Sequence, residues 1–374
     1  MFSLETYIEE LKALVAIDSG HKHAAGTNAV ADFFEGRFRE MGLFVERKYW
    51  EDNGFAPFLT ARNRESGPID VLIVAHMDTV FPVGTAAERP FEIDENGIAH
   101  GPGCADCKAG CLLAANLLQD MMDEGGIPFS VCVALNSDEE TGSHYSRPYF
   151  EELAKQSKVC LVFEPGRAKD EFVGTRKGGV NYVVKCHGIP AHAGVEPEKG
   201  ASAILELAQW IPEIYKLVDY EAGTTINIGK FTGGGDNGSV PDYAEFSLNC
   251  RYLRPEAGDE LRALLERMQA NPFDPRTRVE LIEKTGRPAM IPHEATKELI
   301  AVLEEVGAEL GQPVEILVTG GGSDGNFISP FGVATLDGCG PCGADLHTDK
   351  EYLKVGSVEK RLEIMKALLR KLFG

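Results

Sequence analysis

The first part of the chain alternates between short apolar runs and segments in which apolar residues recur at helical spacing. A continuous run such as Val71–Ala75 is typical of a strand that is buried on both faces of a sheet. The alternation of strand and helix predicts a mostly parallel sheet covered by helices, an α/β fold. The apolar runs lie at residues 71–75, 130–135 and 159–163, and the helical segments lie at 4–15, 27–42 and 112–122.

Beyond about residue 175 the strands have one apolar and one polar face. Four such strands and two helices follow the order βαββαβ, which predicts a small ferredoxin-like α+β unit. After about residue 290 the first pattern returns. We therefore predict a discontinuous α/β domain at 1–175 and 290–374, with a second domain inserted at 176–289. The later strands are expected at 180–186, 224–231, 244–252, 278–283, 314–318 and 332–336, and the helices at 201–217, 259–270, 295–310 and from 358.

The chain is acidic, with a formal net charge of −21 and a pI of about 4.9. This charge argues against nucleic acids and anionic membranes as partners, because both favour basic patches. No apolar run is long enough for a membrane helix, and the N-terminus has no pattern of a secretory signal. Nine cysteines, several within apolar runs, favour buried thiols in a reducing cytoplasm over disulfides.

Two pairs of cysteines have the two-residue spacing of zinc ligands, Cys104/Cys107 and Cys339/Cys342. Together they could hold a structural zinc ion. The residues within the pairs are not typical of a zinc knuckle. We therefore prefer to interpret these cysteines as small residues that lie beside a crowded site.

Six acidic and imidazole side chains follow buried strands or lie in turns near them. In open α/β sheets ligands bind at the carboxyl ends of the strands, which meet at one edge. Two His and three carboxylates are too many for one tetrahedral zinc, but they suit two divalent metals that share a carboxylate. The remaining Glu could accept a proton from a metal-bound water. The six residues are His76, Asp106, Glu139, Glu140, Glu164 and His347.

Asp78 lies two residues beyond His76. A metal-bound His usually donates its other ring N–H to a carboxylate, which fixes the orientation of the ring. We therefore predict that Asp78 supports His76, and the alternative is an ordinary turn aspartate.

The motifs around these residues occur in the order known from one enzyme family. The chain resembles the dinuclear zinc aminoacylase/carboxypeptidase family, which includes glutamate carboxypeptidases of the carboxypeptidase G type, peptidase T, succinyl-diaminopimelate desuccinylase and acetylornithine deacetylase. The similarity covers nearly the whole chain and is closest to the glutamate carboxypeptidase-like enzymes. The matching segments are HMDTV at 76–80, GPGCADCK at 101–108, DEETGS at 138–143, EP at 164–165, AHAG at 191–194, GGGSDG at 320–325 and HTDKEY at 347–352.

The resemblance implies a zinc exopeptidase-like fold with two divalent metal ions, expected to be Zn²⁺, with Co²⁺ or Mn²⁺ as alternatives. Asp106 would bridge the two ions. His76 and Glu164 would complete one site. Glu140 and His347 would complete the other.

The resemblance also implies roles outside the metal ligands. Glu139 would be the general base and acid. His192, in the inserted domain, would hydrogen-bond the scissile carbonyl in the other subunit of a homodimer that forms through that domain. Arg287 would hold the substrate carboxylate, and the backbone N–H groups of Gly320 and Gly321 would assist it.

Two features depart from the family pattern. Many relatives have an Asn where this chain has Gly238, and Asn237 stands one position earlier, where it could replace that contact. Cys104 and Cys107 flank Asp106 where apolar or acidic residues are more usual, which raises the hypothesis of a redox-sensitive metal site.

These observations predict a metallohydrolase that cleaves an amide bond next to a free carboxylate, as an exopeptidase of the glutamate carboxypeptidase or dipeptidase type. The substrate would be a small peptide or an N-acyl amino acid. One alternative is a dedicated N-deacylase of a biosynthetic intermediate. Another is a non-catalytic metal- or amino-acid-binding regulator, but such a protein would not need the base Glu139.

Overall fold

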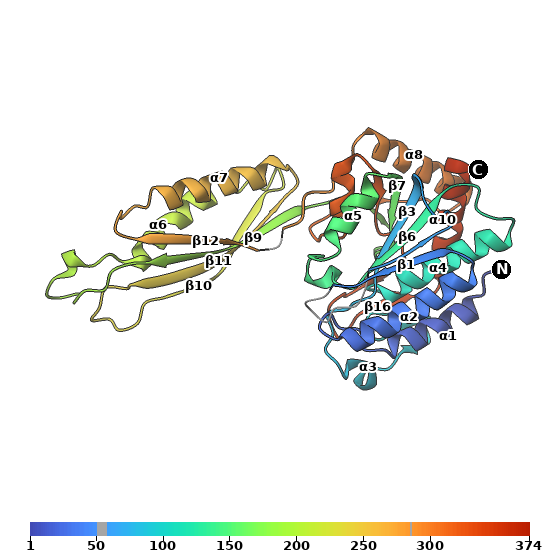
Figure 1. The fold of residues 1–374 in the computed structure, drawn as a ribbon, viewed down its shortest axis with the longest axis horizontal. Coiled ribbons are helices and arrows are strands. Elements are labelled where there is room, and N and C mark those ends of the chain that lie inside the picture. The colour runs from blue at the N-terminus through green and yellow to red at the C-terminus, as the bar shows by residue number, and fades with distance from the viewer. Residues whose placement is uncertain (51–57, 285) are drawn as a thin grey trace. The chain divides into compact units, whose positions relative to one another are not determined.

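The computed structural model describes residues 1–50, 58–284 and 286–374. Contacts between Cα atoms divide the chain into two compact units, each with its own apolar core (Figure 1). The catalytic and dimerisation roles of these parts of the chain remain predictions. The first unit consists of Met1–Thr175, Met290–Thr319 and Ser323–Gly374, and the second consists of Arg176–Ala289 and Gly320–Gly322.

A six-stranded mixed sheet lies at the centre of the first unit. Its strands are β1 (Phe44–Lys48), β2 (Phe58–Arg62), β3 (Ile69–His76), β6 (Val131–Asn136), β7 (Ser157–Val162) and β14 (Ala334–Leu336). The spatial order is β1-β2-β6-β3-β7-β14. The last four strands in this order are parallel to one another, whereas β1 and β2 pair antiparallel. The predicted mostly parallel mixed sheet is therefore confirmed.

Alternate residues of β3 pack into two different apolar clusters. Val71 and Ile73 belong to the cluster on one face, and Leu72 and Val74 belong to the cluster on the other. Because both faces are covered, the strand reads as a continuous apolar run. One face carries α1 (Leu4–Val15), α2 (Ala24–Glu40), α4 (Lys108–Asp123), α8 (Glu294–Glu309) and α10 (Ser357–Phe373), and the other carries α5 (Arg147–Ala154) and α9 (Gly325–Ile328).

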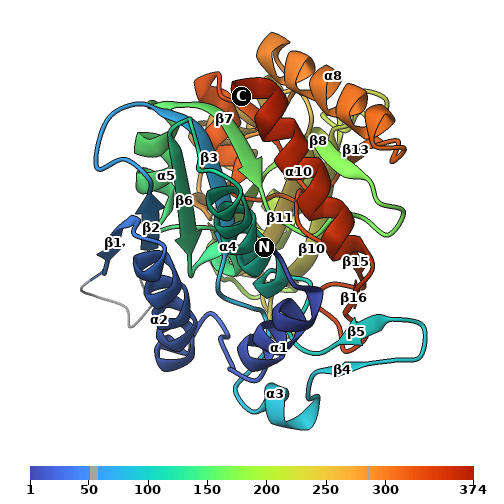
Figure 2. The same cartoon turned by 90° about the vertical axis from the view of Figure 1, so that its right-hand side faces the viewer.

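Helix α4 is the most enclosed helix of this layer, and Figure 2 shows it in front of the sheet with α1, α2 and α10 around it. Almost all of its side chains are buried as a result. The loop 101–107, which carries Asp106, leads directly into this helix. The helix therefore fixes one end of that loop.

Several boundaries differ from those predicted. Helix α2 begins at Ala24, three residues early, while Gly42 has a φ of +76° just beyond its end, as a glycine that terminates a helix does. The strand expected at 314–318 is β13 (Ile316–Thr319), which pairs with the unpredicted β8 (Phe172–Arg176). Strands β1 and β2 were not predicted either.

A second small sheet places two loops of the site next to each other. It consists of β15 (Gly343–Ala344), β16 (Tyr352–Lys354), β5 (Ile98–His100) and β4 (Glu92–Ile93). Because β5 pairs with β16, the residues after His100 lie beside the residues before Tyr352. The remaining short helices are α3 (Thr85–Glu88), η1 (Glu139–Thr141), η2 (Pro197–Lys199) and η3 (Ser329–Phe331).

The second unit has the ferredoxin-like architecture expected from the sequence. Its elements are β9 (Gly178–His187), α6 (Ala203–Tyr215), β10 (Thr225–Gly233), β11 (Tyr243–Tyr252), α7 (Glu256–Ala270) and β12 (Arg278–Glu283). The antiparallel sheet has the order β10-β11-β9-β12, and both helices cover the same face (Figure 1). Burial alternates along β9 and β11, which explains the period of two in the sequence. Among the described residues, no helix has both the length and the apolar composition needed to cross a membrane.

Candidate metal centre

Three of the predicted ligands form a buried group at the carboxyl edge of the large sheet. His76 Nε2 lies 2.9 Å from Asp106 Oδ1 and 3.4 Å from Glu164 Oε1. His76 is the last residue of β3, and Glu164 follows the neighbouring parallel strand β7. The two strand ends therefore deliver these side chains to the same place, as the sequence predicts.

A second group lies on the other side of Asp106. His347 Nε2 is 3.2 Å from Asp106 Oδ2 and 3.3 Å from Glu140 Oε2. Asp106 thus turns one carboxylate oxygen to each group. Glu140 Oε1 is buried and has no hydrogen-bond partner among the described residues. A buried unpartnered carboxylate oxygen, together with this donor set, fits the binding of two divalent cations.

Asp78 joins the first group to the residues after β6. Its carboxylate accepts the backbone N–H groups of Glu139 at 3.3 Å and Glu140 at 3.1 Å. His76 Nδ1 lies 3.3 Å from Asp78 Oδ1 and 3.1 Å from the Asp78 carbonyl oxygen. Asp78 is fully buried. One side chain therefore orients the ring of His76 and fixes the backbone that carries Glu139 and Glu140.

Two supporting residues were not predicted. Glu351 is buried, and its carboxylate accepts the backbone N–H groups of Gly103, Ala105 and Asp106 at 2.9–3.0 Å. Asp138 is also buried and holds the following loop through the N–H of Tyr145 at 2.8 Å. The only signal for Glu351 was its place in the HTDKEY motif.

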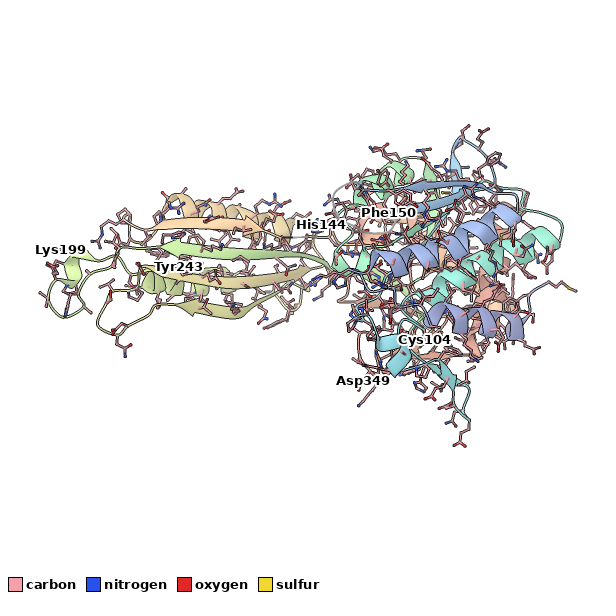
Figure 3. All side chains as sticks on the ribbon, turned by 60° about the horizontal axis from the view of Figure 1, so that its bottom comes forward. Cys104, His144, Phe150, Lys199, Tyr243 and Asp349 are labelled. Carbon is pink, nitrogen blue, oxygen red and sulfur yellow. The ribbon has the colours of Figure 1, made fainter. Side chains whose placement is uncertain are left out.

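The loops joined by Glu351 are marked in Figure 3 by the labels on Cys104 and Asp349. His347 lies on the second loop and has a φ of +63°, in the left-handed region that non-glycine residues seldom occupy. Such strain occurs at functional sites when the surrounding contacts hold it in place. The contacts of His347 Nε2 with Asp106 and Glu140 are of this kind.

Burial and mutual charge shift the pKa values of these groups apart. Burial and the negative charge of Asp106 raise the pKa of Glu140 to about 8 and also raise the pKa of Glu164. Hydrogen bonds to Asp106 and Glu140 raise the pKa of His347 to about 11. Burial opposes the ionisation of Asp106, but hydrogen bonds from His347 and His76 outweigh it and lower its pKa.

These shifts make metal binding depend on pH. In the metal-free protein His347 keeps its proton up to about pH 11, and Glu140 keeps its proton below about pH 8. Because a metal ligand must be deprotonated, binding releases these protons, and affinity rises as pH rises from 6 to 8. We expect a gain of about 10–100-fold per pH unit for one or two protons.

Competition with a chelating dye at pH 6, 7 and 8 measures this gain, and calorimetry in two buffers counts the released protons. Glu140→Gln is the matched control and should release fewer protons. An affinity that does not change between pH 6 and 8 would contradict the expected protonation of the free site.

The cysteines do not form the alternative zinc site. All nine are free and buried, and the groups of possible metal ligands among the described residues do not bring Cys339 or Cys342 together with Cys104. Cys107, however, joins His76, Asp106 and Glu164, and the donor atoms of these four residues all lie within 4.8 Å of one another.

The other predicted site residues belong to the second unit. His192 is exposed and accepts the N–H of Gly194 through Nδ1 at 3.1 Å. It pairs with Ser239 in a short antiparallel bridge, so the exposed Asn237 lies in the turn next to it.

Arg287 pairs through its backbone with Gly179 at the base of β9. The buried Arg176 donates to the carbonyl oxygens of Gly321 at 3.2 Å and Gly322 at 3.3 Å. Arg176 therefore holds the glycine segment that includes Gly320 and Gly321. These bonds are made to carbonyl oxygens and do not involve the N–H groups of the segment.

Comparison with known proteins places this chain in a family. The sequence profile of peptidase family M20/M25/M40 matches residues 72–371. Carboxypeptidase G2 of Pseudomonas sp. strain RS-16 is 30% identical over 369 residues, which cover 97% of this chain and 88% of that protein. A succinyl-diaminopimelate desuccinylase of Alkalilimnicola ehrlichii is 27% identical and covers 90% of this chain and 92% of its own.

Solved structures agree in fold. The aminopeptidase PepT of Bacillus cereus has a TM-score of 0.80 at 22% identity and covers 99% of both chains. A tripeptidase of Staphylococcus aureus has the same TM-score at 21% identity. With the family profile matched over most of its length, the chain belongs to peptidase family M20/M25/M40 and is a metal-dependent hydrolase.

Proposed function

We propose that the chain is a dinuclear exopeptidase that cleaves an amide bond next to a free carboxylate. The observation that carries this proposal is the position of Asp106, whose two carboxylate oxygens face two separate His and Glu pairs. The name of carboxypeptidase G2, the relative at 30% identity, supports a carboxypeptidase activity.

In the proposed site His76, Asp106 and Glu164 hold one ion, and Asp106, Glu140 and His347 hold the other. Two ions held in this way would polarise the substrate carbonyl and acidify a water molecule. Zn²⁺ suits a mixture of imidazole and carboxylate ligands, and Co²⁺ and Mn²⁺ are the alternatives.

Glu139 is the proposed general base and acid. It stands next to the ligand Glu140, and the Asp78 carboxylate fixes the backbone N–H groups of both residues. This support holds Glu139 beside the metal ligands without making it one of them. Glu139 would take a proton from the attacking water and give it to the leaving amine.

The second unit is the proposed source of substrate contacts. Arg287 would bind the substrate carboxylate through its two-pronged guanidinium, and the N–H groups of Gly320 and Gly321 would assist it. His192 would stabilise the oxyanion as it forms, with Asn237 beside it. The net charge of −21 makes such a local cation necessary for an anionic substrate.

A pair of matched substrates tests the proposed specificity. A dipeptide with a free C-terminal carboxylate should be cleaved about 10–100-fold better in kcat/KM than the same dipeptide with a C-terminal amide, because charge-assisted hydrogen bonds contribute about 1.5–3 kcal/mol. Arg287→Ala should remove most of this preference. Equal rates on the two peptides would rule out recognition of the carboxylate.

The second candidate function is deacylation of an N-acyl amino acid, and the similarity to the desuccinylase favours it. An aminoacyl-glutamate, several dipeptides, and N-acetyl and N-succinyl amino acids should be assayed side by side. The substrate with the highest kcat/KM decides between peptidase and deacylase. We also propose a cytoplasmic location, which suits nine unpaired cysteines, and no nucleic-acid or membrane partner.

The proposed homodimer leads to a prediction about His192. If His192 acts in the active site of the partner subunit, a mixed dimer of Glu139→Ala and His192→Ala chains contains one intact site. Purified through two different tags, it should have about half of the wild-type rate, since one of its two sites has both groups. Each variant alone should be at least about 100-fold slower.

Two dimers, each built from one variant and purified in the same way, are the controls. A mixed dimer that is as inactive as these controls would place His192 in the site of its own subunit. A His192→Ala dimer that is as active as the wild type would place His192 outside the reaction. A chain that stays monomeric at assay concentration would contradict the proposed dimer.

A further inference from the structure

The two metal groups differ in the chemistry of their donors. The group around His76 includes a sulfur, because Cys107 Sγ lies within 4.8 Å of the donor atoms of His76, Asp106 and Glu164. The group around His347 contains only nitrogen and oxygen donors among the described residues. Cys107 is fully buried.

The packing at the start of α4 brings this sulfur to the metal group. Cys107 immediately precedes the helix, and its Sγ lies 3.2 Å from the carbonyl oxygen of Phe163, the residue before Glu164. A Cβ atom on Gly110 would lie 1.9 Å from that same oxygen and 3.0 Å from Cys107 Sγ. The absence of a side chain at Gly110 therefore lets the helix approach the end of β7 and keeps the thiol beside Glu164.

The neighbouring cysteine provides an internal contrast. Cys104 lies on the same loop and is equally buried, but its Sγ points to the carbonyl oxygen of Ala99 at 3.7 Å and belongs to neither metal group. Burial alone therefore does not bring a thiol of this loop to the ligands.

We propose that Cys107 supplies a thiolate to the metal position formed by His76, Asp106 and Glu164, so that this position prefers thiophilic ions such as Zn²⁺ and Cd²⁺. The other position keeps only hard and borderline donors. On binding, the S–H bond breaks, its proton is released to solvent, and a sulfur lone pair forms the metal–sulfur bond, so no oxidant is needed. This inference rests on the proposed pair of metal positions.

Cobalt substitution tests the sulfur bond directly. The full-length protein, freed of metal and loaded with two equivalents of Co²⁺, should show a near-ultraviolet sulfur-to-cobalt charge-transfer band. Cys107→Ser should remove the band, whereas the matched control Cys104→Ser should retain it. Circular dichroism and thermal unfolding of each variant show whether the fold is kept.

Metal affinities give a second readout that does not use activity. Loss of Cys107 should weaken Cd²⁺ binding by at least the 10–100-fold that loss of an outer-shell partner costs, and should leave Mn²⁺ binding almost unchanged. Competition titrations on the wild type, Cys107→Ser and Cys104→Ser measure both ions.

The outcomes separate this inference from the proposed function. Two bound Co²⁺ ions in the wild type without a sulfur band would overturn the thiolate and leave the dinuclear site intact. No Co²⁺ bound by the wild type would overturn the dinuclear hydrolase itself. Because the first result needs no variant, a Cys107→Ser protein that fails to fold does not prevent the test.

Discussion

Replacing Glu139 with Gln is expected to lower kcat by about 10²–10⁴-fold, because the side chain loses the ability to accept and return a proton in the transition state. The substitution keeps the size and the polarity of the side chain. Asp78 binds the backbone N–H of this residue and not its carboxylate, so the local structure should persist. Both the metal content and KM should therefore stay close to the wild-type values.

Elemental analysis and steady-state kinetics on the preferred substrate check this result. Glu140→Gln is the matched comparison, since Glu140 is the adjacent residue and lies 3.3 Å from His347 Nε2. That variant should lose metal as well as activity. If Glu139→Gln lost metal to the same extent, or kept its full kcat, Glu139 would not be the base.

Replacing Glu351 with Ala is expected to lower the free energy of unfolding by about 3–5 kcal/mol, because three buried backbone N–H groups lose their hydrogen-bond acceptor. Glu351 is 1% exposed, so little solvent is available to replace the carboxylate. The freed loop also carries Asp106, so both metal affinities should fall together.

Glu351→Gln is a graded control for this prediction. Oε1 accepts from Ala105 and Asp106, and Oε2 accepts from Gly103. An amide retains one oxygen and can keep the first two contacts, so the loss should be about 1–2 kcal/mol. Urea unfolding with and without chelator measures both variants, and equal stability of Glu351→Ala and wild type would show that these bonds do not hold the loop.

Strong patterns made part of the fold predictable from the sequence. The run Val71–Ala75 is apolar on both faces because helices cover both faces of β3, and His76 follows it directly. By contrast, β1 (Phe44–Lys48) is an exposed edge strand of five residues, three of them charged, so its composition resembles that of a loop. Long-range pairing, rather than local preference, makes it a strand.

Some residues of the site could likewise be predicted from the sequence, and others could not. Ligands that follow buried strands, such as His76 and Glu164, could be predicted because parallel strands end at one edge. Glu351 could not be predicted, since a glutamate in a loop is ordinarily exposed, whereas this one is buried against the loop that follows β5. The thiol of Cys107 faces the ligands because of how α4 approaches β7, and that approach has no signal in the spacing of cysteines.

The contact between Glu351 and the Asp106 loop also sets a time at which the centre can form during synthesis. The acceptor and the N–H of Asp106 are separated by 245 residues in sequence. At about 5–20 residues per second, a ribosome needs about 12–50 s to make that stretch. During this interval the loop lacks both His347 and the carboxylate that fixes it. A nascent chain that ends before Glu351 therefore cannot form this contact, and the proposed metal centre can be completed only after translation has passed Glu351.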